Sequence, residues 1–197
     1  MRTHPAPLRR ALAAFALAGA SLGLAPAGAA QELVPHVGNR IPYRVELPAM
    51  AQISEDGASF RARSGDLLVV LAVGDVGEFR VARSLPEFRR GMDAEARRAL
   101  TDVIVSSDAL LLGMLDESLS GVALSDVAKE VRMLGGQRAG YLRGRMRCDC
   151  GHMPLVETHV TVKDGIVYAL TVAGAGDNPE SHEPLMARVH ESFVLPR

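Results

Sequence analysis

Residues 137–172 read QRAGYLRGRMRCDCGHMPLVETHVTVKDGIVYALTV. Apolar and polar residues alternate along most of this stretch, with the period of two that is typical of β-strands. Two groups of turn-forming residues interrupt the alternation, residues 148–153 and Asp164-Gly165. The stretch therefore predicts three consecutive antiparallel strands, around which we expect the rest of the chain to be organised.

The alternation also predicts which side chains share a face of the sheet, because successive side chains of a strand point to opposite faces. The two faces of the first strand carry Leu142, Gly144, Met146 and Cys148 on one side and Tyr141, Arg143, Arg145 and Arg147 on the other. The apolar faces of the next two strands carry Val156, Thr158, Val160 and Val162, and Ile166, Tyr168, Leu170 and Val172.

The turn between the second and third strands decides whether their apolar faces coincide. A two-residue turn at Asp164-Gly165 pairs Lys163 with Ile166 and places the two apolar sets on opposite faces. A three-residue loop that includes Lys163 pairs Val162 with Ile166 and places both sets on the same face, with Gly165 in the left-handed conformation. We expect the three-residue loop, because it aligns the apolar faces.

Three strands are predicted upstream. Charged and apolar residues alternate over residues 43–47, where Pro48 ends the pattern, and again over residues 60–63. Residues 67–73 are continuously apolar, which is typical of a central strand covered on both faces. A turn at Ser64-Gly65-Asp66 separates the last two strands.

Two helices are predicted between residues 84 and 121. Ser84-Leu85-Pro86-Glu87 fits a capping box with proline in the first turn, so we expect a helix to begin there. Its apolar stripe consists of Phe88, Met92, Ala96, Ala99, Leu100, Val103 and Ile104, and Arg89, Arg90, Arg97 and Arg98 lie off the stripe, as on a solvated face. Ser106-Ser107-Asp108 offers a second N-cap, which predicts a break before a leucine-rich helix.

Residues 124–134 fit two structures. Leu124, Val127, Ala128 and Val131 have helical spacing, whereas Val127, Lys129, Val131 and Met133 alternate as in a strand. Gly135-Gly136, directly before the first alternating segment, favours a strand and a hairpin. Further on, Asn178-Pro179-Glu180 predicts the start of a last helix, whose core stripe is Leu185, Met186, Val189 and Phe193.

The first thirty residues have the features of a secretory signal peptide. Three arginines precede an apolar run over residues 11–24, and small residues follow over residues 25–30. A membrane anchor is the alternative, but the run is shorter than the roughly twenty residues that span a bilayer. We expect cleavage near Ala29 or Ala30 and no membrane span in the mature chain.

Cleavage after Ala30 would leave 167 of the 197 residues, enough for one domain with its own core. Residues 31–40 have no periodicity and contain Pro35 and Gly38, so we expect an irregular lead-in before a single α/β domain over residues 41–197. The formal net charge of −1 argues against a nucleic-acid partner. We expect a periplasmic or secreted protein, in an oxidising compartment where thiols are paired or hold a metal.

The order of these patterns resembles the exported PsbP-like and DcrB-like domains. The resemblance rests on the strand Tyr43-x-Val45-x-Leu47-Pro48, on Gly136-Gln137-Arg138-Ala139 opening a strand, on the hairpin over residues 162–172 and on a last helix ending Glu191-Ser192-Phe193. It covers most of residues 41–195. It implies an α/β/α sandwich, built on a mostly antiparallel sheet of about six to seven strands with helices packed on it. It also implies a largely non-enzymatic accessory or binding role.

Motifs typical of enzymes are missing from the sequence. It has no Gly-x-Ser-x-Gly, no Gly-x-x-x-x-Gly-Lys, no His-Glu-x-x-His and no dinucleotide-binding fingerprint. His182-Glu183 and His190-Glu191 lack a second histidine one turn further on, so we interpret both histidines as helix-surface residues. We expect a non-catalytic accessory protein whose partner is another envelope or secreted protein.

Cys148, Cys150, His152 and Met153 form the one chemically distinctive group, since thiolate, imidazole and thioether are ligands that suit Cu(I) or Zn. The first alternative function is therefore a soft-metal site of Cys148, Cys150 and His152, extended by Met153 or by His159 of the next strand. Cys-x-Cys lacks the second cysteine pair of common zinc motifs, which weakens this hypothesis.

A disulfide between Cys148 and Cys150 is the other hypothesis for the two thiols. Residues two apart in an extended strand lie near the upper limit of the Cα separation that a disulfide tolerates, so the bond would be strained and oxidising. Such a bond would suit thiol-disulfide exchange, the third function that we consider. A local structural bridge, or pairing with another chain, remains open.

Overall fold

The computed structural model describes residues 32–57, 59–89, 93–147 and 153–195. Its centre is a seven-stranded sheet in the order β3-β4-β5-β9-β8-β7-β6, and each neighbouring pair is antiparallel. The strands are β3 (Gln52–Asp56), β4 (Ser59–Ser64), β5 (Leu67–Asp75), β6 (Leu124–Leu134), β7 (Gln137–Met146), β8 (Leu155–Lys163) and β9 (Ile166–Gly174). The predicted antiparallel sheet is confirmed. Residues 124–134 form a strand, the structure that we favoured over a helix.

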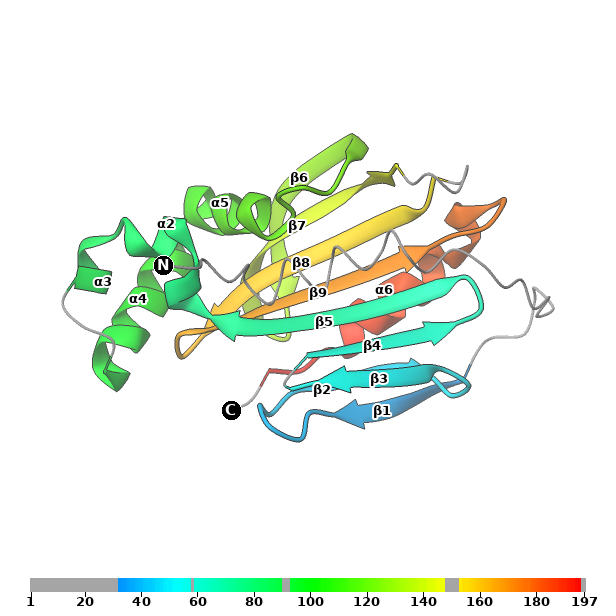
Figure 1. The fold of residues 1–197 in the computed structure, drawn as a ribbon, viewed down its shortest axis with the longest axis horizontal. Coiled ribbons are helices and arrows are strands. Elements are labelled where there is room, and N and C mark those ends of the chain that lie inside the picture. The colour runs from blue at the N-terminus through cyan, green and yellow to red at the C-terminus, as the bar shows by residue number, and fades with distance from the viewer. Residues whose placement is uncertain (1–31, 58, 90–92, 148–152, 196–197) are drawn as a thin grey trace.

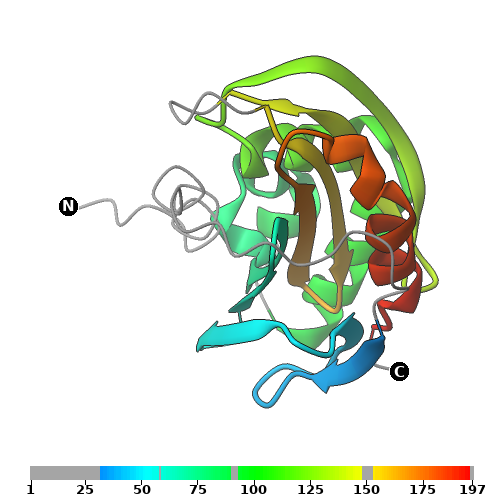
Figure 2. The same ribbon diagram turned by 90° about the vertical axis from the view of Figure 1, so that its right-hand side faces the viewer.

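Layers of other elements cover both faces of this sheet (Figures 1 and 2). One layer contains the 3-10 helix η2 (Val76–Glu78) and the helices α2 (Arg80–Arg83), α3 (Pro86–Arg89), α4 (Ala94–Ser106) and α5 (Asp108–Ser118). The other contains η3 (Pro179–His182), α6 (Glu183–Ser192) and a two-stranded sheet of β1 (Leu33–Val37) and β2 (Arg44–Pro48). The α/β/α sandwich is confirmed, with β1 and β2 completing the layer of α6.

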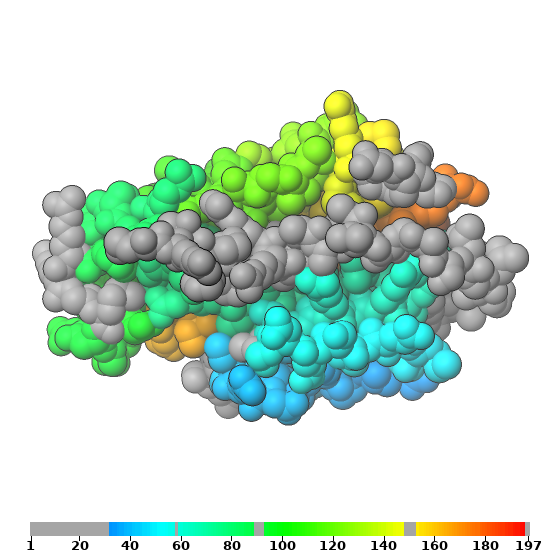
Figure 3. All heavy atoms as spheres, viewed as in Figure 1, coloured from blue at the N-terminus to red at the C-terminus, as the bar shows by residue number. Residues whose placement is uncertain are grey.

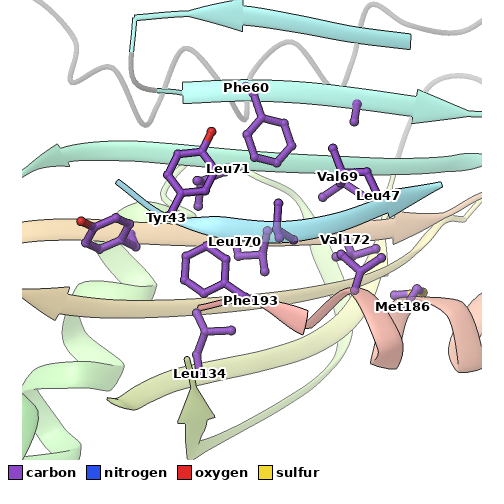
Figure 4. Packing of buried hydrophobic residues seen from close by; sticks show 14 of the residues in the cluster. Tyr43, Leu47, Phe60, Val69, Leu71, Leu134, Leu170, Val172, Met186 and Phe193 are labelled. Atoms are coloured by element: carbon purple, nitrogen blue, oxygen red, sulfur yellow. The ribbon is translucent and has the colours of Figure 1, made fainter. Parts of the chain in front are cut away.

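Each face of the sheet has its own hydrophobic core. On the face of α6, Tyr43, Phe60 and Phe193 pack as an aromatic cluster, with Tyr43 stacked on Phe60 at 5.8 Å and on Phe193 at 6.2 Å between ring centroids (Figure 4). On the other face, Leu100, Ile104, Leu111, Met114 and Leu115 of α4 and α5 pack on Val160, Val162, Val167 and Ala169 of β8 and β9. Strands β8 and β9 are therefore buried on both sides.

The predicted three-residue loop between β8 and β9 is wrong. Lys163 pairs with Ile166, and both residues of the Asp164-Gly165 turn have positive φ, 51° and 76°. Positive φ at both turn positions is the geometry of a two-residue type I′ turn, for which Asp-Gly is a preferred sequence. The two apolar sets do lie on opposite faces, and this is tolerated because helices cover both faces.

The turn is held in place by the helical layer. The Gly165 amide donates to Thr101 Oγ1 of α4 at 2.9 Å, and the Val76 amide donates to the Gly165 carbonyl at 2.9 Å. A Cβ atom at position 165 would lie 2.9 Å from Cγ of Arg97. This turn therefore needs glycine both for its φ and for the close approach of α4.

Replacing Gly165 with alanine is expected to destabilise the protein more than the same change at Gly65. Both glycines have positive φ, which costs an alanine about 1–2 kcal/mol, but nothing lies within 4 Å of a Cβ at Gly65. Chemical denaturation measures the loss of stability in each variant. The difference between the two losses isolates the contact with Arg97. Equal losses would show that the Arg97 side chain moves aside without cost.

The predicted helix through Ser84 and Ile104 is divided in the structure. Helix α3 begins at Pro86, as the capping box predicted, but α4 has its own N-cap, Asp93, whose carboxylate accepts from the Ala96 amide at 2.8 Å. A side chain that caps a helix competes with continuation of the preceding one, and the apolar stripe did not reveal this second start. The second predicted N-cap is confirmed, because Ser107 Oγ accepts a hydrogen bond from the Leu110 amide at the start of α5.

The lead-in contains a strand that the sequence did not predict. Strand β1 pairs along its length with β2, and Pro35 lies opposite Glu46. Strand β2 also pairs with the end of the chain, where the amides and carbonyls of Arg44 and Val194 bond reciprocally. A strand paired on one side and largely exposed needs no apolar alternation, and an edge strand tolerates proline.

The two edges of the main sheet lie far apart on the molecule. In the space-filling view, the segments of β1–β4 occupy one long side and β6 with α5 the opposite side (Figure 3).

No helix among residues 32–57, 59–89, 93–147 and 153–195 is long and apolar enough to cross a membrane. The predicted signal peptide lies outside these residues.

Candidate functional site

Strand register brings a set of polar residues together on the face of the sheet beneath α6. Tyr141 of β7 lies opposite His159 of β8, and Arg143 lies opposite Glu157. These four side chains share a face, as the alternation predicted for Tyr141 and Arg143. Helix α6, red in Figure 2, crosses this face. Its buried His190 packs on the ring of His159.

A cavity of about 360 Å³ lies between the sheet and α6. We call it the imidazole pocket. It is lined by Arg132 and Met133 of β6, Tyr141 and Arg143 of β7, Glu157 and His159 of β8, and Glu183, Ala187, His190 and Glu191 of α6. Three consecutive strands and the later helix α6 therefore contribute to one pocket, of a size that suits a small organic molecule.

Two buried imidazoles form the centre of this pocket. The rings of His159 and His190 lie 4.4 Å apart between centroids, and the residues are 5% and 8% exposed. Nδ1 of His159 and both ring nitrogens of His190 are buried without a hydrogen-bond partner. Buried polar atoms are almost always paired, so three unpaired nitrogens in one pocket indicate missing partners.

Burial keeps both imidazoles neutral. It lowers the pKa of His159 to about 4, with a smaller effect from the nearby positive charge of Arg132. Burial, together with His159 and Arg132, lowers the pKa of His190 well below the usual value. Each neutral ring carries one N–H donor and one acceptor nitrogen, so the pair offers both kinds of hydrogen-bonding group.

Arg143 organises the charged wall of the pocket. Its guanidinium donates to both carboxylate oxygens of Glu183, at 2.6 and 3.2 Å, and to Glu157 at 3.4 Å. The hydrogen bond and charge of Glu183 raise the pKa of Arg143. The other oxygen of Glu157 lies 3.7 Å from Nε2 of His190, which is close but beyond a hydrogen bond.

Tyr141 lines the pocket beside His159. The two rings lie 4.7 Å apart, and the guanidinium of Arg132 stacks over the Tyr141 ring at 3.7 Å. Arg132 also donates to Glu130 at 2.8 Å. Burial and then the Glu157 carboxylate raise the pKa of Tyr141 to about 12, so its hydroxyl is a neutral donor and acceptor.

Most of the predicted metal ligands cannot be placed relative to one another. Cys148, Cys150 and His152 lie outside the described residues, and Met153 is exposed just before β8. His159 lies four residues beyond Leu155, about 13 Å along the strand at a rise of ~3.3 Å per residue. Its imidazole packs on the rings of Tyr141 and His190. Among the residues that the structure describes, no three His, Cys, Asp or Glu side chains are arranged to hold a metal ion.

The interpretation of His190 as a surface histidine is wrong. Its position could have been found from the sequence, because His190 follows Met186 by four residues and precedes Phe193 by three. These spacings place His190 in the apolar stripe that packs on the sheet. His182, the other histidine interpreted as a surface residue, lies outside the pocket and is partly exposed.

The fold and the pocket define an α/β/α domain with a polar pocket between the sheet and α6. No protein-family model and no curated protein matches the chain. Among solved structures, it is similar to the solution structure of cyanobacterial PsbP (CyanoP) from Synechocystis sp. PCC 6803, with 16% identity and a TM-score of 0.48 over 88% of this chain and 98% of that chain.

Two further solved structures are similar at lower scores. LpqN of Mycobacterium tuberculosis, described as involved in cell envelope biogenesis, has 14% identity and a TM-score of 0.42, over 85% of this chain and 93% of that one. A protein of Bacteroides thetaiotaomicron has 11% identity and a TM-score of 0.40, over 79% of this chain and 45% of the other. A PsbP is thus among the similar structures, as the resemblance implied, and the likeness concerns the fold alone.

Proposed function

We propose that this protein is an exported, non-catalytic binding protein that holds a small molecule in the imidazole pocket. The observation that carries the proposal is the set of three unpaired ring nitrogens of His159 and His190, buried in a cavity of about 360 Å³. A buried unpaired polar group costs about 1–3 kcal/mol. A bound molecule that supplies the missing hydrogen bonds would remove this cost.

Binding explains the site better than catalysis does. A general base works best with a pKa near the working pH, and burial lowers the pKa of His159 to about 4. A base of this strength removes protons poorly near neutral pH. The same neutral ring is well suited to positioning a ligand through one donor and one acceptor.

A fragment screen by NMR tests the proposal. We expect fragments that bind to shift the ring resonances of His159 and His190, in protein labelled with ¹⁵N in the imidazoles. The His190→Leu variant should lose this binding, whereas His182→Gln, which changes a histidine outside the pocket, should retain it. A screen in which no fragment shifts either ring would contradict the proposal.

We propose a soft-metal site as the second candidate function, supported by the ligand chemistry of Cys148, Cys150 and His152. The chain enters this segment from β7 and leaves it into β8, and the Met146 amide donates to the Pro154 carbonyl at 2.9 Å. The ends of β7 and β8 on either side of this segment are therefore held together.

Metal content separates this candidate from a redox role. If the segment holds a metal, protein purified from the periplasm should contain copper or zinc in a one-to-one ratio, and Cys148→Ser, Cys150→Ser should lose it. Elemental analysis and a free-thiol assay provide the two measurements. Protein without metal and with an internal disulfide would rule out the metal site and leave thiol exchange to be tested.

A further inference from the structure

The charges that line the imidazole pocket do not balance. Arg143 is paired with Glu183, and Arg132 is paired with Glu130. The lining itself holds two arginines against three carboxylates, those of Glu157, Glu183 and Glu191. Glu157 is largely buried and shares Arg143 with Glu183, while Glu191 is exposed. With both imidazoles neutral, the pocket therefore carries a net negative charge.

The unpaired nitrogens add a second requirement. His190 is more than nine-tenths buried, and its two ring nitrogens require one acceptor and one donor from a ligand. Nδ1 of His159 requires a further partner, so the ligand must combine N–H or O–H donors with an acceptor oxygen or nitrogen. A purely apolar molecule of the same volume would leave all three nitrogens unpaired.

We propose that the ligand of this pocket is a small organic cation, a primary amine that also carries a hydroxyl or similar hydrogen-bonding group. The inference rests on the proposed binding function. The ammonium group would lie near Glu157 and Glu191 and donate to an imidazole nitrogen, and the second group would satisfy the remaining ring nitrogens. An anionic ligand would instead face these two carboxylates, at a cost that is large in a partly buried site.

Three probes that differ in one terminal group, and so in net charge, test this class of ligand. They are an aminobutanol, a butanediol and a hydroxybutyrate, which share a four-carbon chain and a terminal hydroxyl group. The affinity of the full chain for each is measured by titration of the His159 and His190 ring resonances near pH 7. We expect the amine to bind about tenfold more tightly than the diol, and the carboxylate to bind least.

A charge-neutralising variant locates the effect. Glu191→Gln removes an exposed carboxylate at the rim of the pocket, so it should weaken binding of the amine about three- to fivefold, as expected for one charge at a protein surface, and leave the diol unaffected. Glu95→Gln, in the first turn of α4, is the matched control and should change neither affinity.

The outcomes separate the ligand class from the function. If the diol or the carboxylate binds as tightly as the amine, the preference for a cation is wrong and small-molecule binding is retained. If none of the three probes binds while other fragments shift the two rings, the amine class is also wrong. If neither the probes nor any fragment shifts the rings, both the ligand class and the binding function are contradicted.

Discussion

The His190→Leu variant is expected to be more stable than the natural protein by about 1–3 kcal/mol in the absence of ligand, because a buried unpaired polar group costs this much. The imidazole of His190 is 8% exposed, and neither of its ring nitrogens has a partner. Leucine is similar in volume and has no polar atom to leave unpaired. The substitution therefore exchanges a binding group for a more stable core.

Denaturant unfolding of the ligand-free protein measures this effect. Met186→Leu is the matched control, since Met186 lies one turn earlier on the same face of α6 and is fully buried. A swap of this kind changes stability by less than about 1.5 kcal/mol. Destabilisation of His190→Leu well beyond that of Met186→Leu would show that the imidazole has partners in solution, and would remove the basis of the proposed binding function.

Stability is also expected to fall between about pH 7 and pH 4, by about 3 kcal/mol from His159 alone, at 1.36 kcal/mol per pKa unit. The pKa of His159 is about 4 in the folded protein, and its ordinary value is 6.5. Between these values the unfolded chain binds a proton that the folded chain excludes, so acid favours unfolding. The lowered pKa of His190 acts in the same direction.

The groups around the two rings determine how strongly acid destabilises the folded protein. Arg132 of β6 opposes protonation of both imidazoles, and a charge on one ring opposes a charge on the other. Glu157 faces His190 from β8 at 3.7 Å and favours its protonation. Burial outweighs this attraction, because the pKa of His190 is lowered overall.

Comparison of unfolding curves for the natural protein and His159→Leu isolates the histidine from the carboxylates, which also titrate in acid. The leucine variant lacks this titrating group. We therefore expect the stability of His159→Leu relative to the natural protein to rise by about 3 kcal/mol as the pH is lowered from 7 to 4. His182→Leu is the control outside the pocket. A constant difference would show that His159 is protonated equally in the folded and unfolded chains.

Much of the sheet followed from local sequence patterns. Alternation placed Tyr141 and Arg143 on one face of β7 and Leu142 and Met146 on the other, and the structure buries Leu142 beneath the helical layer. A continuous apolar run identified β5 as a central strand. These patterns are reliable because the direction of a side chain in a strand depends only on its position in that strand.

Errors arose where the answer depended on distant residues. The loop at Asp164-Gly165 was expected to align the apolar sets of β8 and β9, on the assumption that one face of the hairpin is buried. Helices α4 and α5 cover the second face, so the two-residue turn buries both sets. The strand β1 was missed for a related reason, since its structure comes from pairing with β2.

The imidazole pocket shows the same division between local and distant information. Local sequence was enough to identify the strands that carry Tyr141 and His159 and the helix that carries His190. Their assembly required the register between β7 and β8 and the return of α6 across that face of the sheet. Whether a histidine is a solvated surface residue or a neutral, unpaired group in a cavity depends on what packs against it, and here that covering comes from a helix more than twenty residues further along the chain.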